Sequence, residues 1–423
     1  MTNSYTALLG KAVQKIARLR GGGSALPGLF VEKIDPNFVP RTLATLPLGV
    51  VVVSGTNGKT TTTKMVVELL EGQGLRVFTN RTGSNFVRGV AAALLSDVDR
   101  SGKLYADIAV LELDEAHAVH FVKAVQPRFS LLLNVMRDQL DRFGEIDTTA
   151  KMLQHIAEST SQTVVINRED PRLARLGALY ADKTVYFGLS SDLQALFPND
   201  DTMRSGGTVG GKQPPADVVL QKIEDEQTAS FTMGKETLTA TLELRGVYNI
   251  FNAAAALALV RQIIGDTIDN DKLKTSLSHI TPAFGRGESL TVGGHTLELV
   301  LVKNPSGFRL SLSSFNPEGY ATMITINDNY ADGRDMSWLW DVDFDSLKTE
   351  GVAKVAGIRA FDMALRLQYD EVAVGDVTPY LPDALRSFIE QNPHRPKRIY
   401  CTYTAMLALR RELAKITNVE TIS

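Results

Sequence analysis

The sequence predicts an α/β protein whose central domain holds a mostly parallel sheet and a phosphate-binding loop. Short apolar runs rich in β-branched residues alternate with segments of helical periodicity, which is the pattern of βαβ units. One such run, at residues 48–53, leads directly into a Gly-rich loop and then into a helical segment. Strand, loop and helix in this order form the layout in which backbone N–H groups and a helix N-terminus bind phosphate.

The first two parts of the chain are distinguished by composition. Residues 1–47 are expected to form an amphipathic helix at 5–20, ended by three glycines, and a proline-rich loop that leads into the next domain. Residues 48–285 are expected to form the central domain. Within it, residues 190–240 are a polar, turn-rich insertion, and the alternation at 230–244 is typical of antiparallel strands. The other elements expected in this domain are strands at 76–79, 108–113, 130–133 and 163–166 and helices at 90–95 and 252–260.

A second α/β unit follows the central domain. Residues 282–288 are interpreted as a hinge, because they combine proline, glycine and charge. Residues 286–423 are expected to form a C-terminal Rossmann-like domain. Its strands are predicted at 297–302, 321–327, 352–355, 371–374 and 398–401.

The length, composition, net charge and cysteine count of the chain narrow the class of protein. A chain of 423 residues predicts two or three domains, and 44% hydrophobic with 22% charged residues is the composition of a globular protein. The net charge of -3 gives no general attraction to nucleic acid or anionic lipid. A single cysteine excludes a disulfide within the chain and a zinc cluster built on cysteines. No transmembrane segment and no secretory signal are recognised, so a cytoplasmic protein is expected.

The loop after the first strand is the strongest functional signal. Lysine at its end can neutralise a phosphate, and the following threonine hydroxyl can hold Mg²⁺. Val53 stands where the usual motif has its first glycine, so the match is incomplete. The candidate nucleotide-binding residues of this loop are Gly55, Thr56, Asn57, Gly58, Lys59, Thr60 and Thr61.

Other predicted strands also end in polar residues, at the edge where open parallel sheets bind ligands. Glu112 ends the run 108–113 and is a candidate Mg²⁺ ligand, whereas Asp114 and Glu115 fit a solvated acidic loop equally well. Residues 137–142 concentrate four charged groups, and residues 327–343 hold both tryptophans and five aspartates. The latter composition fits a pocket or a partner surface.

The histidines and the cysteine suggest no catalytic centre. The six histidines are scattered, and their spacing matches neither a Ser-His-Asp triad nor an H-E-x-x-H metal motif. Cys401 ends a predicted strand, where a buried structural cysteine is expected rather than a nucleophile.

Taken together, these stretches resemble the Mur ligase superfamily, the ATP-dependent ligases of peptidoglycan synthesis. Residues 55–61 look like that superfamily's phosphate loop, including the missing first glycine. Further motifs narrow the resemblance to the MurT family, the ligase subunits of lipid II isoglutaminyl synthase. They lie at residues 137–145, 246–252, 284–288, 303–305 and 332–338.

The resemblance implies an ATP-dependent amidation. The α-carboxyl of D-glutamate in the lipid II stem peptide would be phosphorylated, and ammonia would convert the acyl phosphate to D-isoglutamine. Lys59 and the loop amides would stabilise the transferring phosphate, while Thr60 and Glu112 would hold Mg²⁺. By the same resemblance, the further nucleotide contacts are Asn249, Asn252 and Arg286. The site of action would be the inner face of the membrane.

The resemblance also implies a partner. The sequence has no recognisable glutaminase centre, and MurT-like proteins pair with GatD, a glutamine amidotransferase-like subunit. In that family the ligase is thought to supply an aspartate to the partner's triad, and both Asp335 and Asp341 are candidates here.

Two departures from the family pattern stand out. MurT proteins commonly carry a four-cysteine zinc ribbon, but the insertion 190–240 has no cysteine. It is therefore expected to fold without metal or to be partly disordered. Gln139 stands where amino-acid-adding Mur ligases have histidine, so a second Mg²⁺ site is not expected.

Two other hypotheses remain open. A Mur-like amino-acid-adding ligase, such as a folylpolyglutamate synthase, predicts ATP hydrolysis that depends on an added amino acid. It leaves the segment 332–343 without a role. A non-catalytic nucleotide-binding scaffold predicts ATP binding without turnover, and the presence of Lys59, Thr60 and Glu112 together argues against it.

Overall fold

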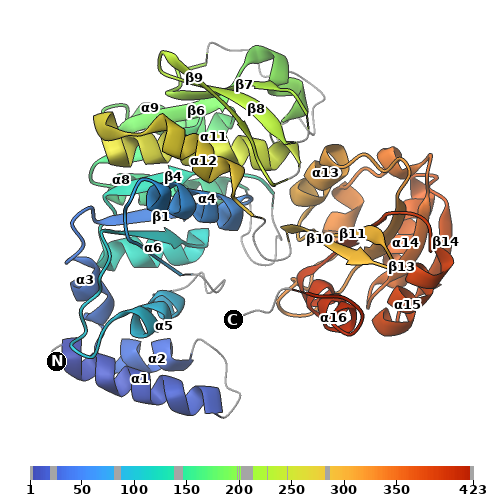
Figure 1. Ribbon diagram of the computed structural model, residues 1–423, viewed down its shortest axis with the longest axis horizontal. Helices are drawn as coiled ribbons and strands as arrows, with labels where there is room; N and C mark the ends of the chain where they lie inside the picture. Colours follow the sequence, from blue (N-terminus) through green and yellow to red (C-terminus); the bar gives the residue numbers. More distant parts are fainter. Residues whose placement is uncertain are drawn as a thin grey trace. The chain divides into compact units, whose positions relative to one another are not determined.

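The structure is a computed structural model of the chain, and it consists of two compact units (Figure 1). The residues it describes are 3–19, 26–80, 87–137, 146–197, 199, 201, 213–225, 227–244, 246–281 and 286–419. Unit 1 comprises Met1–Met136, Ile146–Glu243 and Asn249–Ile280. Unit 2 comprises Arg137–Glu145, Leu244–Tyr248 and Thr281–Ser423.

Unit 1 is built on a nine-stranded sheet with the order β2-β3-β1-β4-β5-β6-β7-β8-β9. The strands are β1 (Val50–Ser54), β2 (Val77–Thr79), β3 (Ile108–Glu112), β4 (Phe129–Leu132), β5 (Thr163–Asn167), β6 (Thr184–Leu189), β7 (Val218–Ile223), β8 (Thr228–Met233) and β9 (Glu236–Thr241). Pairing is parallel from β2 to β7 and antiparallel from β7 to β9. β1 is buried along its whole length between β3 and β4, which accounts for its unbroken run of valines.

Unit 1 also contains helices, some of which precede its first strand in the chain. They are α1 (Asn3–Leu19), α2 (Leu26–Ile34), α3 (Phe38–Leu43), α4 (Lys59–Gly72), α5 (Val87–Asp97), α6 (Glu115–Ala124), α8 (Ile146–Ser159), α9 (Pro171–Leu179), η1 (Ser191–Leu196), α11 (Val247–Ile264), η2 (Gly265–Thr267) and α12 (Asn270–Ser278). The predicted proline-rich loop is wrong in its described part, because α2 and α3 occupy it. Pro27 and Pro40 lie in the first turn of their helices, where a missing N–H costs nothing.

The helix α11 is the central core helix of unit 1. By length and composition it could cross a membrane, and it is the one such helix among the described residues. Its alanine-rich middle, residues 253–260, is fully buried, together with Ile250. A helix that is apolar all round is expected in the interior of a large domain, and this burial explains the composition.

The predicted insertion of unit 1 contains ordered strands in its described part. η1 follows β6, and β7 adds parallel to β6 before the antiparallel β8 and β9. The antiparallel pairing expected from the alternation at 230–244 is confirmed, but it already begins at β7. Residues 198, 200 and 202–212 of the insertion lie outside the described residues.

Unit 2 is built on a six-stranded sheet with the order β10-β11-β15-β12-β13-β14. Its strands are β10 (Arg286–Val292), β11 (His295–Leu301), β12 (Ala321–Thr325), β13 (Val352–Ala356), β14 (Val374–Thr378) and β15 (Lys397–Cys401). β10 and β11 form an antiparallel hairpin, and the remaining pairs are parallel. Its helices are α13 (Pro305–Ser314), η3 (Ser337–Asp341), η4 (Asp345–Leu347), α14 (Ala360–Tyr369), α15 (Leu381–Gln391) and α16 (Tyr403–Leu413).

Two predictions for unit 2 are wrong. Residues 286–288, interpreted as part of a hinge, belong to β10, whereas residues 282–285 lie outside the described residues. The strand predicted at 371–374 begins only at Val374. Glu371 has a φ of 57° and belongs to the turn that ends α14, where Val372 N–H donates to the Leu367 carbonyl.

In unit 2, alternate residues of the strands lie on opposite faces of the sheet, where they pack into two separate hydrophobic cores. Tyr400 packs with Phe308, Trp338 and Phe344, beneath α13, η3 and α14. Its neighbour Cys401 belongs to the other core, which α15 and α16 cover. Burial raises the pKa of the Cys401 thiol, so the prediction of a buried structural cysteine is confirmed.

Candidate active site

The loop between β1 and α4 requires glycine at two positions. Gly55 has a φ of 133° and Gly58 a φ of 86°, both in the region that L-residues with side chains rarely adopt. A Cβ on Gly58 would lie 2.7 Å from Asn252 Oδ1, and one on Gly55 would lie 3.0 Å from Asn134 N. The loop therefore passes close to both α11 and the segment after β4.

Asn134, which follows β4, holds the loop by its backbone and its side chain. Its carbonyl accepts from Thr56 N–H at 3.1 Å, and its Oδ1 accepts from Asn57 N–H at 2.9 Å. Its Nδ2 donates to the Asn57 carbonyl at 3.0 Å. The Thr56 hydroxyl adds a two-way contact with Met136, donating to its carbonyl at 3.2 Å and accepting from its N–H at 3.1 Å. The loop is thus fixed by the protein itself.

Lys59 is the first residue of α4, and its side chain turns back over the loop. Its Nζ donates to the Gly55 carbonyl at 2.5 Å and to the Thr56 carbonyl at 3.3 Å. It also forms an ion pair with Glu115 Oε2 at 3.2 Å, and both side chains are almost fully buried. The ammonium group is therefore held beside the N-terminus of α4, where a helix favours an anion.

Thr60, Glu112 and Asn80 form the second part of the site. The Thr60 hydroxyl donates to Glu112 Oε1 at 2.8 Å. Asn80, the residue after β2, makes two hydrogen bonds to the backbone of Glu112. Its Nδ2 donates to the Glu112 carbonyl at 2.7 Å, and its Oδ1 accepts from the Glu112 N–H at 3.0 Å. Register pairs Val53 with Glu112, so the carboxylate lies level with the start of the loop.

The oxygen donors of Thr60 and Glu112 fit Mg²⁺. A hydroxyl and a carboxylate are hard ligands, and Mg²⁺ takes one or two protein ligands while water and substrate phosphates complete its octahedron. Among the described residues, no group of three or more His, Cys, Asp or Glu side chains is placed to hold a metal ion. A cation at Thr60 and Glu112 accordingly needs oxygens from a bound nucleotide.

Asp170 supports the same edge of the sheet from the end of β5. Its carboxylate caps α9 by accepting from Arg172 N–H at 2.9 Å and Leu173 N–H at 3.1 Å. It also accepts from Val135 N–H at 2.6 Å, which ties α9 to the segment that holds the loop. Burial raises the pKa of Asp170 to about 6 against these three donors.

The other residues predicted for nucleotide binding are only partly placed. Asn249 and Asn252 lie three residues apart on α11, so they share a face, and Asn252 lies against Gly58. Thr61 is buried within the first turn of α4. Arg286 begins β10 in unit 2, and its side chain lies outside the described residues, as does Gln139.

Asp335 and Asp341 flank η3 in unit 2. Asp335 accepts from Ser337 N–H at 2.9 Å, and hydrogen bonds from Ser337 lower its pKa. Asp341 ends η3 and is exposed. Neighbouring Asp332 is buried and bound by Thr404 N–H at 2.7 Å and Thr404 Oγ1 at 2.5 Å, and burial raises its pKa.

Sequence reasoning missed three residues that shape the site, namely Asn80, Asn134 and Asp170, and it left Glu115 open between a site residue and a solvated loop. Each follows a strand of the parallel sheet, at the edge where the loop lies. Their position shortly after the predicted strands was the signal in the sequence that could have identified them as site residues. Glu115 in particular is buried against Lys59, so an exposed acidic loop is the wrong interpretation for it.

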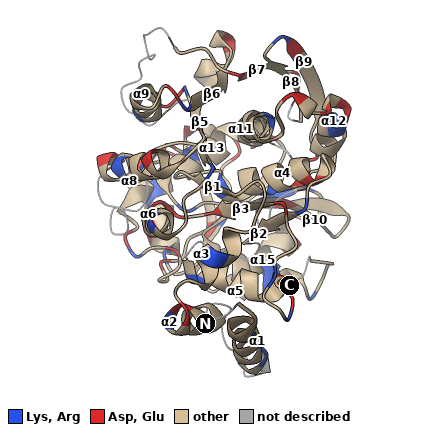
Figure 2. Cartoon of the chain, turned by 90° about the vertical axis from the view of Figure 1, so that its left-hand side faces the viewer, with Lys and Arg blue, Asp and Glu red and all other residues tan. Residues whose placement is uncertain are grey.

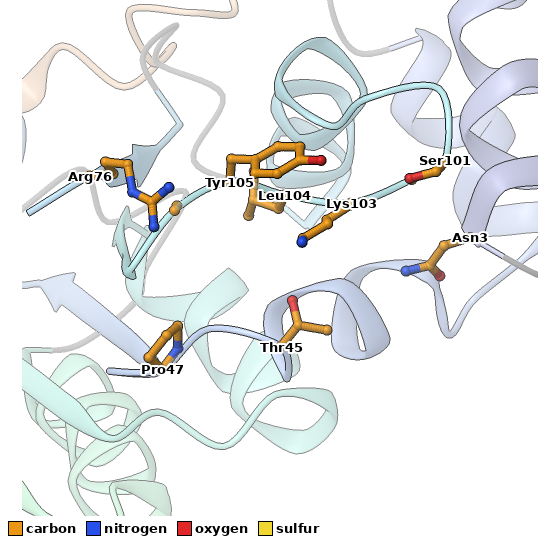
Figure 3. A pocket seen from close by; sticks show the side chains of 10 residues that line it. Asn3, Thr45, Pro47, Arg76, Ser101, Lys103, Leu104 and Tyr105 are labelled. Carbon is orange, nitrogen blue, oxygen red and sulfur yellow. The ribbon is translucent and has the colours of Figure 1, made fainter.

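A pocket of about 470 Å³ lies at the opposite edge of this sheet (Figure 3). Pro47, Arg76 and Ala106 line it, and they precede β1, β2 and β3, whereas the loop follows β1. Because these strands are parallel, the pocket and the loop lie at opposite strand ends. The pocket is therefore not part of the candidate active site.

The architecture is shared with several solved structures. The structure superimposes on a pseudomurein peptide ligase type C from Methanothermus fervidus with a TM-score of 0.68 at 18% identity, covering 88% of this chain and 79% of that chain. It superimposes on Mycobacterium tuberculosis folylpolyglutamate synthase with a TM-score of 0.64 at 15% identity, covering 92% and 94%. At these identities the likeness establishes the fold.

Sequence comparison defines the class. Residues 53–260 match the Mur ligase middle domain family, and residues 301–406 match the MurT ligase C-terminal family. With the fold and the lysine-threonine loop, these matches make the protein an ATP-dependent ligase of the Mur class.

Full-length relatives identify the family within this class. The chain is 30% identical to the MurT subunit of lipid II isoglutaminyl synthase (glutamine-hydrolyzing) from Streptococcus pneumoniae, over 96% of both chains. It is also 30% identical to the Staphylococcus aureus subunit of the same name, over 88% of this chain and 89% of that one. The chain belongs to the MurT family.

Proposed function

We propose that this protein amidates the α-carboxyl of D-glutamate in the stem peptide of lipid II, forming D-isoglutamine. The observation that carries the proposal is the grouping of Lys59, Thr60 and Glu112 around a preformed phosphate loop, in a chain of the MurT family. In the first step, a carboxylate oxygen of the substrate attacks the γ-phosphorus of ATP and ADP leaves. In the second, ammonia attacks the acyl carbon, phosphate leaves, and the proton lost by the nitrogen passes to the phosphate.

The site residues suit the first step. Lys59 Nζ and the N-terminus of α4 stabilise negative charge on the transferring phosphoryl group. The Thr60 hydroxyl and the Glu112 carboxylate would hold Mg²⁺, which supplies charge neutralisation at the phosphates. Asn80 and Asn134 act as positioning residues, because their side chains bind the backbone of Glu112 and of the loop.

The second step requires ammonia, and the single cysteine of the chain is not suited to release it from glutamine. This cysteine, Cys401, is fully buried in a hydrophobic core, and a thiol whose pKa is raised by burial is a poor nucleophile. The S. pneumoniae relative is named as a subunit of a glutamine-hydrolysing enzyme. A GatD-like glutamine amidotransferase subunit is therefore the proposed source of ammonia.

Unit 2 has an exposed aromatic stripe suited to such a partner. Phe361, Leu365 and Tyr369 lie at four-residue spacing on α14, and Phe361 and Tyr369 are 68% and 69% exposed. Trp340 of η3 extends the stripe, because its ring packs edge-on against the ring of Tyr369, with 5.1 Å between the two ring centroids. Exposed aromatic side chains grouped in this way are typical of protein interfaces.

The stripe is continuous with the segment that carries the two candidate aspartates. Trp340 and Asp341 are adjacent in η3, and Asp341 is exposed. An aspartate beside the docking face could orient a histidine of the partner, and the proposal leaves Asp335 and Asp341 as the two alternatives.

The decisive experiment measures isoglutamine formation on lipid II with ATP and Mg²⁺, with ammonium at raised pH or with glutamine. The chain alone is expected to use ammonium, and the complex with its partner is expected to use glutamine as well. One of the changes Asp335→Asn and Asp341→Asn should abolish the glutamine reaction and spare the ammonium reaction, with Asp383→Asn, at an exposed aspartate of α15, as the control. ATP hydrolysis that depends on an added amino acid, without amidation, would overturn the proposal in favour of an amino-acid-adding ligase.

A further inference from the structure

The first helix, α1, presents an apolar stripe to solvent. Tyr5, Leu8 and Ile16 are 55%, 52% and 53% exposed, and Ala12 between them is also exposed. At 100° per residue these four positions fall within about 80° of one another around the helix. The opposite face, with Thr6, Ala7, Gly10 and Ala17, is buried in unit 1. The exposed stripe is therefore a second apolar face of an already packed helix.

The fold holds α1 firmly, so this face is a fixed surface. A Cβ on Gly10 would lie 2.5 Å from Leu95 of α5, which shows how closely the helix backbone approaches its neighbour. Lys11 Nζ donates to the Val98 carbonyl at 2.6 Å, and Gln14 donates to Ser96 Oγ at 2.8 Å. Thr6 donates to the buried Asp35 at 2.6 Å. The helix is anchored by its inner face, and nothing in unit 1 covers its described outer side chains.

The charge of α1 indicates what covers the outer face. The helix contains two lysines and one arginine and no Asp or Glu (Figure 2). Lys15 is exposed next to Ile16. An apolar stripe on a helix that carries basic and no acidic residues is typical of a helix that lies in the surface of an anionic bilayer. The helix α14 differs, because it carries Asp362 as well as Arg366.

We propose that α1 is a membrane-contact helix that places Tyr5, Leu8 and Ile16 in the headgroup region of an anionic bilayer. The inference rests on the proposed function, whose substrate is a lipid confined to the membrane. Contact through α1 would hold the enzyme at the surface where the substrate diffuses, and raise its local concentration there. A single short helix gives weak and reversible binding, which suits an enzyme that must move between substrate molecules.

The test uses the full-length chain and sedimentation with vesicles of phosphatidylglycerol and phosphatidylcholine, without lipid II. The native protein is expected to bind these vesicles, and to bind them less as the salt concentration is raised. It should not bind vesicles of phosphatidylcholine alone. The double change Leu8→Glu with Ile16→Glu should weaken binding about tenfold or more. Leu179→Glu is the matched control, because Leu179 of α9 is also an exposed leucine of unit 1.

Kinetics separate this proposal from the proposed function. The double variant should show a raised KM for lipid II in vesicles, and an unchanged kcat with detergent-dispersed substrate. Equal vesicle binding by the native and doubly changed proteins would overturn the membrane role of α1. The proposal would also be overturned if the native protein were a dimer that the double change converts to monomers. The stripe would then be an interface with a second copy of the chain. Vesicle binding without amidation would instead count against the proposed function alone.

Discussion

Lys59 Nζ and Glu115 Oε2 lie 3.2 Å apart with both side chains almost fully buried beneath the phosphate loop. The pair joins the start of α4 to the start of α6, two helices that follow the neighbouring strands β1 and β3. A bound phosphate would give the ammonium group a second anionic partner. Glu115 thus keeps Lys59 in place when no phosphate is present.

Breaking this pair should destabilise the protein. Glu115→Gln is expected to lower the free energy of unfolding by about 3 kcal/mol, because it leaves a buried ammonium without its carboxylate. Chemical denaturation measures the change, and adding Lys59→Met to it should restore part of the loss. Glu68→Gln is the control, since the Lys64–Glu68 pair at 3.6 Å is partly exposed and worth at most about 0.5 kcal/mol. Equal losses from Glu115→Gln and Glu68→Gln would contradict the expectation.

Loss of the Asn80 side chain should weaken the response to Mg²⁺. Asn80→Ala removes both hydrogen bonds that orient the Glu112 backbone, so the Mg²⁺ concentration for half-maximal activity should rise on the order of 10–100-fold. Titration of ATP hydrolysis with Mg²⁺ measures this. Gln73→Ala is the matched control, because the Gln73 amide grips the Asp269 backbone in the same two-way manner away from the loop. The two variants responding alike to Mg²⁺ would show that Asn80 does not position Glu112.

Asp170 should make stability fall as pH rises. Its pKa of about 6 in the folded protein exceeds the ordinary 3.8, so the folded state binds the proton more tightly. The resulting stabilisation is complete below about pH 4 and is lost as pH rises through 6, and it amounts to about 3 kcal/mol. Asp170→Asn removes the titrating group and keeps one cap acceptor, so the variant should gain stability relative to the native protein between pH 4 and 7.

Denaturation curves at a series of pH values provide this measurement. Asp269→Asn serves as the control, because Asp269 caps α12 through Asp271 N–H and Lys272 N–H at a partly exposed site. A constant difference between Asp170→Asn and the native protein over this range would mean that Asp170 titrates as an ordinary carboxyl.

The aromatic stripe of α14 should matter only when glutamine is the nitrogen source. Phe361→Glu places a charge in the proposed docking face, and the glutamine-dependent rate of the complex should fall about tenfold or more, as expected for loss of a buried aromatic anchor. The ammonium-dependent rate of the chain should not change. Ile416→Glu, at another exposed apolar residue of unit 2, is the control. A parallel fall of both rates after Phe361→Glu would place the defect in folding or in the ligase site.

The core of unit 1 and its loop were predictable because each is encoded over a few consecutive residues. The valines of β1 indicate a strand buried on both faces, and Gly55, Gly58 and Lys59 follow within six residues. Burial of Lys59 against Glu115 was not predictable in the same way. It depends on β3 pairing beside β1, so the two residues meet only through the sheet register.

Other errors have equally local causes. Gly293 and Gly294, with φ values of 59° and 82°, form the two-residue turn of the β10–β11 hairpin, and this Gly-Gly signal was available in the sequence. The position of β14 was not, because its exposed edge residues, including Asp376, carry little hydrophobic alternation. Composition alone suggested a loop where α2 and α3 form, since prolines in a first helical turn look like prolines in a loop.

The carboxamide of Asn134 has a thermodynamic consequence for nucleotide binding. By closing on Asn57 from both sides, it leaves the phosphate loop already in one conformation when no nucleotide is present. The entropy of ordering that backbone is therefore lost when the chain folds, not when ATP arrives. Association then needs no slow rearrangement of the loop, and the enthalpy of the new phosphate contacts is opposed by little additional loss of backbone freedom.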